Sequence, residues 1–532
     1  MNNSWQKWQP FIYGLLLGIG IVLGMVLKPK NSYNLVGSQN KFNELLGIIQ
    51  SEYVDTVNLE EIESTTFNDL LNKLDPHSVY IPAKDLKTVN EPLDGNFEGI
   101  GVEFNIVNDT IMVVTAISGG PSADLGIQSG DRIIKADTTN LAGVKITNDD
   151  VVKALKGKKG TQVLVSIYRP SSKQIIKYNI TRNTIPIYSV DASFMLNSNT
   201  GYLKISRFGA TTHQEFVEAV EKLKNQKMKN LVLDLRGNPG GFLKAATDIV
   251  DELLDDGKMI VYTEGRAKPK QSYKTENRGI FEDGKLAVLI DEGAASASEI
   301  VSGAIQDWDR GLVIGRRSFG KGLVQEPFEL SDGSAIRLTI ARYFTPSGRC
   351  IQKKYNEGYA HYEEDIYNRL ENGELESDFF SAINDTTKYF TKIKNRVVYS
   401  GGGISPDFKV AIDTTFNSKF LTQIAAVGLI NKMAYQYVDL NRKKLKDFKS
   451  IDDFIANFNV DNSLFNELVA LAETEKINKP SSKELARSEN FIKLQLKAII
   501  ARQLWRDGGY FKVTSIKDRT VQKAILELKN LN

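Results

Sequence analysis

One serine stands where a predicted strand turns into a predicted helix. The segment Gly293–Ile300 (GAASASEI) contains Ser296 and follows the apolar run Leu286–Ile290. Because the first backbone N–H groups of a helix have no partner inside it, they can stabilise the oxyanion that forms when a serine attacks a carbonyl group. Serine and small residues are also common as ordinary helix caps, so this position alone allows both a nucleophile and a cap.

A glycine-rich turn offers a second set of N–H groups. Asp234–Gly241 (DLRGNPGG) directly follows the predicted strand Leu231–Leu233 and ends in two adjacent glycines, Gly240 and Gly241. Glycines before a helix can turn their N–H groups toward a ligand, so the segment could cradle an oxyanion or a phosphate. A tight connection between strand and helix, without any ligand, is the alternative.

The segment Gly315–Gly322 (GRRSFGKG) carries the spacings of two other catalytic motifs. It differs from a phosphate-binding P-loop at its last position, where Gly322 replaces the Ser or Thr that would bind magnesium. It also holds Ser318 and Lys321 in the Ser-x-x-Lys spacing of penicillin-binding enzymes. Both motifs require a helix, whereas glycines interrupt this segment and Leu323–Phe328 contains a proline. The pattern therefore disfavours both an NTPase and a nucleophilic Ser318.

A lysine is a credible base for a serine nucleophile in this chain. Lys321 lies between glycines after the apolar run Leu312–Ile314, a position that is consistent with burial. Burial makes a lysine lose its proton more easily, because desolvation disfavours the charged amine. None of the three histidines is near Ser296 along the chain; they are His77, His213 and His361.

Length and composition limit the elements that position these residues. The 532 residues predict about three to four domains. With 41% apolar and 25% charged residues, the chain has the composition of a globular protein, which excludes a polytopic membrane protein and a wholly disordered chain. The net charge of +3 gives no argument for a nucleic-acid partner. A single cysteine excludes an intramolecular disulfide and disfavours a His/Cys metal site.

The first part of the chain predicts helices and then short strands. Residues 40–75 have the apolar periodicity of two helices, separated at Glu52–Asn58, and Pro76 cannot continue the second helix. Residues 97–182 are different, because short β-rich runs alternate with Gly, Asn and Asp turns and with two short helical stretches.

The remainder predicts an α/β core followed by helices. Between residues 200 and 345, apolar strands alternate with helical stretches, which predicts a sheet with helices on both faces. Residues 352–398 are rich in tyrosine and charge and are predicted to be an insertion. From about residue 416 the pattern predicts helices with basic exposed faces.

An uncharged run near the N-terminus predicts a membrane segment. Residues 11–27 carry no charge and have lysines on both sides. The run is short for a membrane span and slightly long for a signal-peptide core, and no A-x-A-like cleavage site follows. We therefore expect an uncleaved signal anchor; a cleaved signal peptide and a buried helix are the alternatives. Two GxxxG spacings in the run could pack two such helices together in a homo-oligomer.

Together these segments resemble the carboxyl-terminal processing (tail-specific) serine proteases. The resemblance covers roughly residues 40–410. It is carried by six motifs in order: LDPHS at 74–78, DLRGNPGG at 234–241, ASASEI at 295–300, GKGLVQ at 320–325, YFTPSGR at 343–349 and GGGISPD at 401–407.

The resemblance implies a Ser/Lys dyad without metal or organic cofactor. Ser296 matches the nucleophile, Lys321 matches the base, and Gln325 matches the residue that orients the lysine. Gln325 is four residues beyond Lys321, within reach if the chain makes a helical turn there. The oxyanion hole would be formed by the N–H of Ala297 and one from Gly240 or Gly241.

Residues 97–182 resemble the PDZ domain that these proteases carry. Gly99, Ile100, Gly101 and Val102 match the loop whose N–H groups receive the carboxylate of a C-terminal tail, and the following strand would add the peptide to the sheet edge. The helices after residue 416 look like the C-terminal extension of some relatives. The resemblance assigns them no role.

These expectations define an endopeptidase that recognises protein substrates by their free C-termini, anchored to the inner membrane with its catalytic part in the periplasm. The rivals are a catalytically idle PDZ scaffold and a ligand-binding relative without protease activity. The expected fold is a mixed-sheet α/β core with an inserted PDZ domain. Its expected domains are a signal anchor and linker (1–37), an N-terminal helical segment (38–94), the PDZ domain (95–185), the catalytic core (186–415) and a C-terminal helical extension (416–532).

Overall fold

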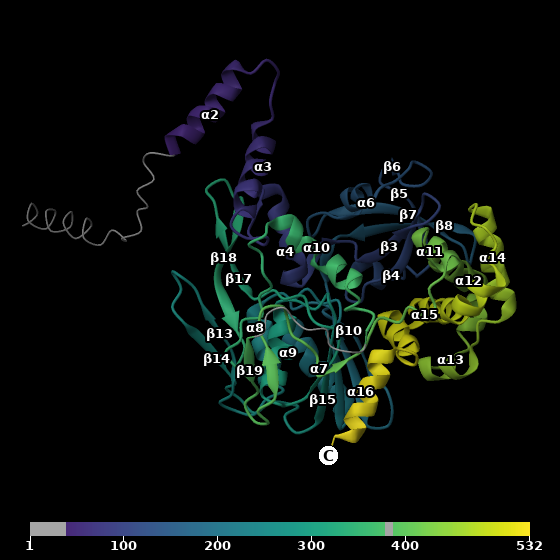
Figure 1. Ribbon diagram of the computed structural model, residues 1–532. Helices are drawn as coiled ribbons and strands as arrows, with labels where there is room; N and C mark the ends of the chain where they lie inside the picture. The colour runs from purple at the N-terminus through teal and green to yellow at the C-terminus, as the bar shows by residue number, and fades with distance from the viewer. Residues whose placement is uncertain (1–38, 378–386, 532) are drawn as a thin grey trace, which may run out of the picture. The chain divides into compact units, whose positions relative to one another are not determined.

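The computed structural model describes residues 39–377 and 387–531 (Figure 1). The predicted membrane segment at residues 11–27 lies outside this part. Among the residues that are described, no helix combines the length and the apolar character needed to cross a bilayer. Among these described residues, those up to Phe67 form one compact unit and those from Asn68 onward form another.

The two helices predicted near the N-terminus are confirmed. They are α2 (Gln39–Glu52) and α3 (Leu59–Asn72), and the predicted break falls between them. The short strand β1 (Val79–Ile81) follows Pro76, and a third helix, α4 (Ala83–Asp94), ends at Gly95 in a left-handed conformation.

The β-rich segment forms a separate antiparallel sheet, as predicted. The strand order is β3-β4-β5-β7-β8, with β6 paired to β5. Strands β2 and β9 pair with each other where the chain enters and leaves this region. Its own core consists of aliphatic side chains such as Ile111, Ile133 and Val165. The elements are β2 (Asn96–Gly99), β3 (Val102–Ile106), β4 (Ile111–Ala116), α5 (Pro121–Asp124), β5 (Arg132–Ala136), β6 (Thr139–Asn140), α6 (Asn148–Leu155), β7 (Gln162–Arg169), β8 (Gln174–Thr181) and β9 (Asn183–Pro186).

The predicted mixed sheet with helices on both faces is also confirmed. Its order is β10-β11-β12-β15-β16-β21; β10 and β11 are antiparallel, and the remaining neighbours are parallel. The elements are β10 (Val190–Met195), β11 (Thr200–Ile205), α7 (Thr212–Asn225), β12 (Asn230–Asp234), α8 (Leu243–Asp251), β15 (Lys285–Ile290), α9 (Ala297–Asp307), β16 (Leu312–Gly315) and β21 (Phe408–Lys409).

The two faces of this sheet are covered from different parts of the chain. Strands β11, β12, β15 and β16 follow one another across the sheet in one direction, so right-handed crossovers place α7, α8 and α9 on the same face. The other face holds Tyr202, Val232 and Leu289, and it is covered by α16 (Arg519–Asn530) from the end of the chain.

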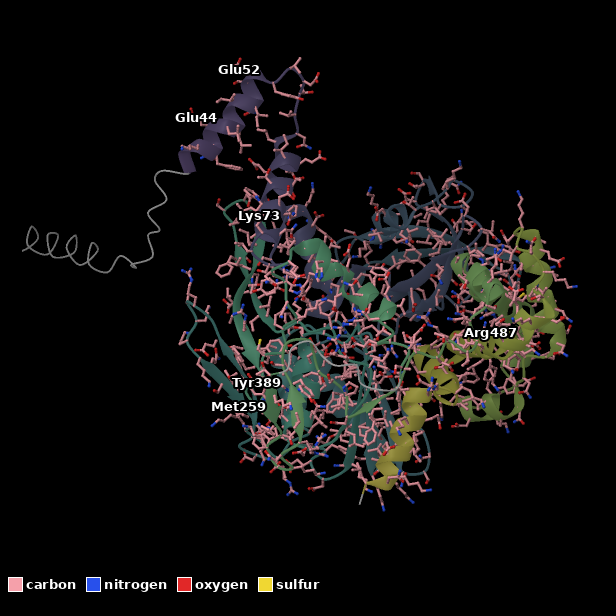
Figure 2. The ribbon with its side chains drawn as sticks, in the orientation of Figure 1. Glu44, Glu52, Lys73, Met259, Tyr389 and Arg487 are labelled. Atoms are coloured by element: carbon pink, nitrogen blue, oxygen red, sulfur yellow. The ribbon has the colours of Figure 1, made fainter. Side chains whose placement is uncertain are left out.

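A second sheet, which is antiparallel, carries part of the candidate site. Its strands alternate along the chain with those of the mixed sheet. Its order is β1-β18-β13-β14, with β17 paired to β18. The strands are β13 (Met259–Glu264), β14 (Gln271–Lys274), β17 (Leu323–Glu329) and β18 (Ala335–Phe344). The predicted insertion contains α10 (Tyr359–Glu371) and the hairpin of β19 (Lys388–Phe390) and β20 (Val397–Tyr399). Figure 2 labels Met259 on β13 and Tyr389 on β19.

The C-terminal part is helical, as predicted, and we call it the helical region. It has its own apolar core, with large side chains such as Phe420, Phe454 and Leu496 fully buried. Its helices are α11 (Lys419–Ala426), α12 (Leu429–Leu445), α13 (Ile451–Asn457), α14 (Asn462–Thr474), α15 (Ser482–Ser515) and α16. Helix α15 is interrupted by non-helical backbone at Trp505 and Arg506.

Candidate active site

Ser296 lies on a strained turn between β15 and α9. Its backbone dihedrals are φ 55° and ψ −113°, a region that residues with a Cβ rarely adopt. Ala295 and Ala297 are buried on either side, whereas Ser296 itself is half-buried. Strain of this kind costs about 1–3 kcal/mol and persists where surrounding contacts enforce it, often at functional sites.

Two backbone N–H groups, one on the serine turn and one on the glycine turn, are available to an oxyanion. The N–H of Ala297 is the first of α9, and among the described residues neither it nor the N–H of Gly241 has a hydrogen-bond partner. The N–H of Gly240 instead donates to Asn238 Oδ1 at 2.8 Å. Of the two glycines considered from the sequence, Gly241 therefore offers the free donor.

Gly240 allows the glycine turn to lie close to the serine turn. A Cβ atom on Gly240 would lie 2.7 Å from the Ser296 Cβ, and its φ is 100°. Only a glycine allows the two turns to approach this closely.

Asn238 joins the glycine turn to the serine turn through its buried side chain together with its backbone carbonyl. The side-chain Nδ2 donates to the carbonyl of Ile205 at 3.0 Å, and the backbone carbonyl of Asn238 accepts from Ala295 N and from Ser298 Oγ. Asn238 belongs to the DLRGNPGG motif, but sequence reasoning gave it no role. It is fully buried, so these hydrogen bonds hold both turns in one arrangement.

Lys321 lies two residues before β17 and contacts Gln325. The Lys321 Nζ lies 3.0 Å from Gln325 Oε1, and the Gln325 amide nitrogen donates to the carbonyl of His77. The helical turn that the spacing would have required is not formed: Gln325 is on a strand, and the register against β18 shifts between Val324 and Gln325. The two side chains therefore meet without a helical turn between them.

The surroundings of Lys321 favour its neutral form. Burial lowers the pKa of Lys321, and the nearby Arg337 charge lowers it further, against smaller opposing effects of Asp75 and Glu299. The amine is thus shifted toward the range in which a lysine can accept a proton.

The alternative motifs at residues 315–322 fail because no helix follows them. Strand β17 begins at Leu323, so neither a P-loop nor a Ser-x-x-Lys helix can form. Ser318 is completely buried; its hydroxyl donates to Glu299 Oε1 and accepts from Ile404 N at 2.6 Å. It is a structural side chain, as the sequence pattern indicated.

One histidine is close to the lysine, although the sequence separates them widely. The His77 ring lies 2.8 Å from Tyr362 Oη on α10. Burial and then the charge of Lys321 lower the pKa of His77 to about 3. An imidazole with this pKa is neutral at pH 7 and is a weak base.

The buried carboxylate of Glu299 connects the serine turn to the lysine loop. It accepts hydrogen bonds from the N–H groups of Ser296 (2.8 Å), Gly320 (2.8 Å) and Lys321 (2.9 Å), and from the Ser318 hydroxyl. Burial raises the pKa of Glu299 to about 7, and these hydrogen bonds oppose the rise.

The buried Tyr343 hydroxyl makes a second connection, because it lies within hydrogen-bond distance of the carbonyls of both Ser296 and Lys321. Sequence reasoning missed both Glu299 and Tyr343. The signal for Glu299 was present, since Ser-x-x-Glu at a helix start is the capping-box pattern.

We expect Glu299→Gln to lower kcat by about 10- to 100-fold and also to lower the unfolding temperature. Each carboxylate oxygen accepts two hydrogen bonds, so the amide NH₂ must face N–H or O–H donors, and unmet buried donors cost about 1–3 kcal/mol. Steady-state kinetics and thermal unfolding measure the two effects. Glu292→Gln, at a half-buried carboxylate paired with Arg316, is the control; an equal loss in both variants would contradict a special position for Glu299.

The loop between β2 and β3 has free N–H groups as well. Among the described residues, the N–H groups of Ile100 and Gly101 have no hydrogen-bond partner, while their carbonyls accept from Ser122 and Ile117. Gly101 has φ 75°, which turns the chain at this point. Strand β3 pairs only with β4 among the described strands, so its other edge is open next to this loop.

The outer face of β3 is covered by the helical region. Glu103 is 2.7 Å from Arg502 on α15, and Asn105 donates to the Tyr435 hydroxyl on α12 at 3.0 Å. Met112 and Val114 of the neighbouring β4 are part of the apolar core of the helical region. The helical region therefore packs against one face of β3 and β4, while the edge of β3 stays open.

Three family models match successive parts of the chain. Residues 99–180 match the PDZ domain and residues 199–363 match peptidase family S41. Residues 420–507 match a family of unknown function, DUF8443.

Relatives extend the match over most of the chain before the helical region. The chain is 34% identical over 348 residues to a carboxy-terminal-processing protease of Bartonella bacilliformis, covering 64% of this chain and 79% of that one. It is also 34% identical over 318 residues to a probable CtpA-like serine protease of Staphylococcus aureus, covering 59% of this chain and 63% of that relative. A solved photosystem II D1 C-terminal processing protease is 24% identical and covers 72% of this chain and 89% of that one, with a TM-score of 0.37.

The turn between strand and helix, the PDZ domain and these sequence matches agree on one class, the serine peptidases with a PDZ domain. The chain belongs to the carboxy-terminal-processing protease family and is a serine-type C-terminal processing peptidase. These matches confirm the family that the six sequence motifs indicated.

Proposed function

We propose that the chain hydrolyses protein substrates with a Ser/Lys dyad and selects them by their free C-terminal tails. In this proposal Ser296 is the nucleophile, Lys321 the base, and Gln325 the residue that orients the lysine. The observation that carries it is the environment of Lys321: a buried amine with a lowered pKa, held at 3.0 Å by a glutamine, on a loop that shares two buried contacts with the serine turn.

The reaction begins when neutral Lys321 accepts the proton of the Ser296 hydroxyl. The Ser296 Oγ attacks the scissile carbonyl, and the N–H groups of Ala297 and Gly241 stabilise the oxyanion of the tetrahedral intermediate. The peptide C–N bond then breaks, and the leaving amine takes the proton from Lys321. Neutral Lys321 next takes a proton from a water molecule, which attacks the acyl-enzyme. The ester C–O bond then breaks, and Lys321 returns the proton to Ser296 Oγ, so both groups are restored.

In this proposal the loop between β2 and β3 of the PDZ domain, which we call the PDZ loop, recognises the tail. The free N–H groups of Ile100 and Gly101 would bind the terminal carboxylate, together with Gly99 and Val102 on either side, and the open edge of β3 would pair with the tail. A substrate held by its terminus offers its preceding segment to a separate active site.

We expect amidation of a substrate's C-terminus to raise KM by about tenfold or more, because the lost carboxylate contacts are worth roughly 1 kcal/mol each for several hydrogen bonds. Cleavage rates of one unfolded protein with a free and with an amidated terminus measure this effect. Equal KM values for the two substrates would show that the terminal carboxylate is not recognised. That result would not contradict the proposed Ser/Lys dyad.

The rival function is a PDZ scaffold that binds tails without cleaving them. The intact set of Ser296, Lys321 and Gln325, and the strained turn on which the serine lies, favour the enzyme. Incubation of the whole chain with an unfolded protein tests the proposal. New C-termini, identified by mass spectrometry, support it, and binding without cleavage over a wide pH range would establish the scaffold instead.

For localisation we propose an anchor in the inner membrane with the peptidase in the periplasm. The support is the uncharged run at residues 11–27 followed by lysines. Recovery of the protein in the carbonate-washed membrane fraction is the expected result, and its release as a shortened soluble chain would indicate a cleaved signal.

A further inference from the structure

The helical region reaches the catalytic core at the start of the glycine turn. Arg236 follows β12 and forms two hydrogen bonds from its Nε to the carboxylate of Asp234, at 3.0 and 3.1 Å. Its Nη1 lies 2.9 Å from Oδ2 of Asp518, which comes just before α16. The side chains of Arg236 and Asp518 are 19% and 24% exposed, so the ion pair is largely shielded from water.

Asp518 is itself held firmly in place. It caps α16, because its Oδ1 accepts from Thr520 N at 2.9 Å and Val521 N at 3.1 Å. The apolar side of that helix is packed on the core sheet through Val521, Ala524 and Leu528. Helix α16 follows α15, on which Figure 2 labels Arg487. The cap, the packed helix and the ion pair make a fixed support for Arg236.

A short segment, residues 237–239, connects Arg236 to the two glycines of the turn. Arg236 is followed by Gly237, whose N–H donates to Asp291 at 2.7 Å, and by the buried Asn238. Asn238 binds the N–H of Gly240 and contacts the Ser296 turn, and Gly241 comes next with its free N–H. A shift of Arg236 would therefore change the direction of the Gly241 donor.

We propose that Asp518 is a positioning residue for the reaction. Through its contact with Arg236, the helical region helps to hold the glycine turn in the orientation that the reaction needs. The inference rests on the proposed role of Gly241 in the oxyanion hole. An oxyanion exists only after attack on the carbonyl, so a misplaced donor lowers kcat and leaves substrate binding unchanged.

The test uses the whole chain with Asp518→Ser. Serine keeps the helix cap but is too short to reach Arg236. We expect kcat to fall by about 3- to 10-fold with KM unchanged, the range for a largely shielded ion pair that acts through geometry. Asp518→Asn keeps both the cap and an acceptor for Arg236 and should lie between wild type and Asp518→Ser.

Asp461→Ser is the matched control, because Asp461 caps α14 in the same helical region by accepting from Leu464 N at 2.9 Å. Hydrogen exchange of the peptide covering residues 235–242 gives a readout that does not depend on activity, and it should become faster in Asp518→Ser only. Unchanged kcat and unchanged exchange in an active enzyme would overturn the inference. An inactive wild type that still shows the exchange difference would overturn the proposed function and the catalytic role together, while retaining the structural contact.

Discussion

Replacing Ser296 with alanine should abolish peptide-bond hydrolysis, with kcat reduced on the order of 10⁶-fold, as expected when the nucleophile of a covalent mechanism is removed. The acyl-enzyme cannot form without the Oγ, and water in its place lacks the fixed geometry of the turn. The release of new C-termini from an unfolded protein measures the loss. Binding of a fluorescent peptide with a free carboxylate should stay at the wild-type level, because the PDZ loop is a separate site.

The control for this variant is Ser318→Ala. Ser318 donates one of the four hydrogen bonds to Glu299, so its loss should weaken activity and stability without abolishing turnover. Near-normal cleavage by Ser296→Ala, together with an inactive Ser318→Ala, would show that the nucleophile has been assigned to the wrong serine.

Replacing Lys321 with arginine should be as damaging as replacing it with alanine, with kcat lowered on the order of 10⁴-fold or more. Arginine keeps the positive charge, but its pKa above 12 prevents it from accepting the serine proton. The comparison of both variants in the same cleavage assay separates charge from basicity. Substantial activity in Lys321→Arg would mean that the proton goes to another group.

The pH dependence of the wild type tests the same role. Since burial lowers the pKa of Lys321, the neutral amine becomes available below the ordinary lysine value of 10.5. The rate kcat/KM should therefore rise with pH through one ionisation, with its midpoint below 10.5, and reach a plateau when the lysine is neutral. A rising limb centred at or above 10.5 would contradict a buried base.

Much of the local structure was predictable because short-range patterns determine it. The apolar runs at residues 231–233 and 286–290 are central strands, and Ser296 lies at the predicted junction of strand and helix. A buried strand needs continuous apolar residues, and a turn into a helix needs small ones, so both leave a mark in the sequence. The residue types at positions 296 and 321 allowed a serine nucleophile with a lysine base, and the family resemblance assigned these roles.

The sequence could not predict how Gln325 reaches Lys321. A spacing of four residues brings two side chains together in a helical turn, but pairing with β18 makes this segment a strand, and the two side chains meet all the same. Strand pairing is a property of two distant segments, so it overrides the local spacing. Tyr343 joins the serine and lysine loops for the same reason, since its place in β18 is set by that pairing.

By itself, the sequence determined which elements form and which side chains could react, because periodicity, glycines and prolines act within a few residues. Only the tertiary structure decided which of two glycines has a free N–H, that buried Glu299 and Tyr343 link the Ser296 turn to the Lys321 loop, and that α16 covers the second face of the core sheet. These features depend on contacts between residues far apart in the chain. Burial and long-range pairing create such contacts, and no local pattern encodes them.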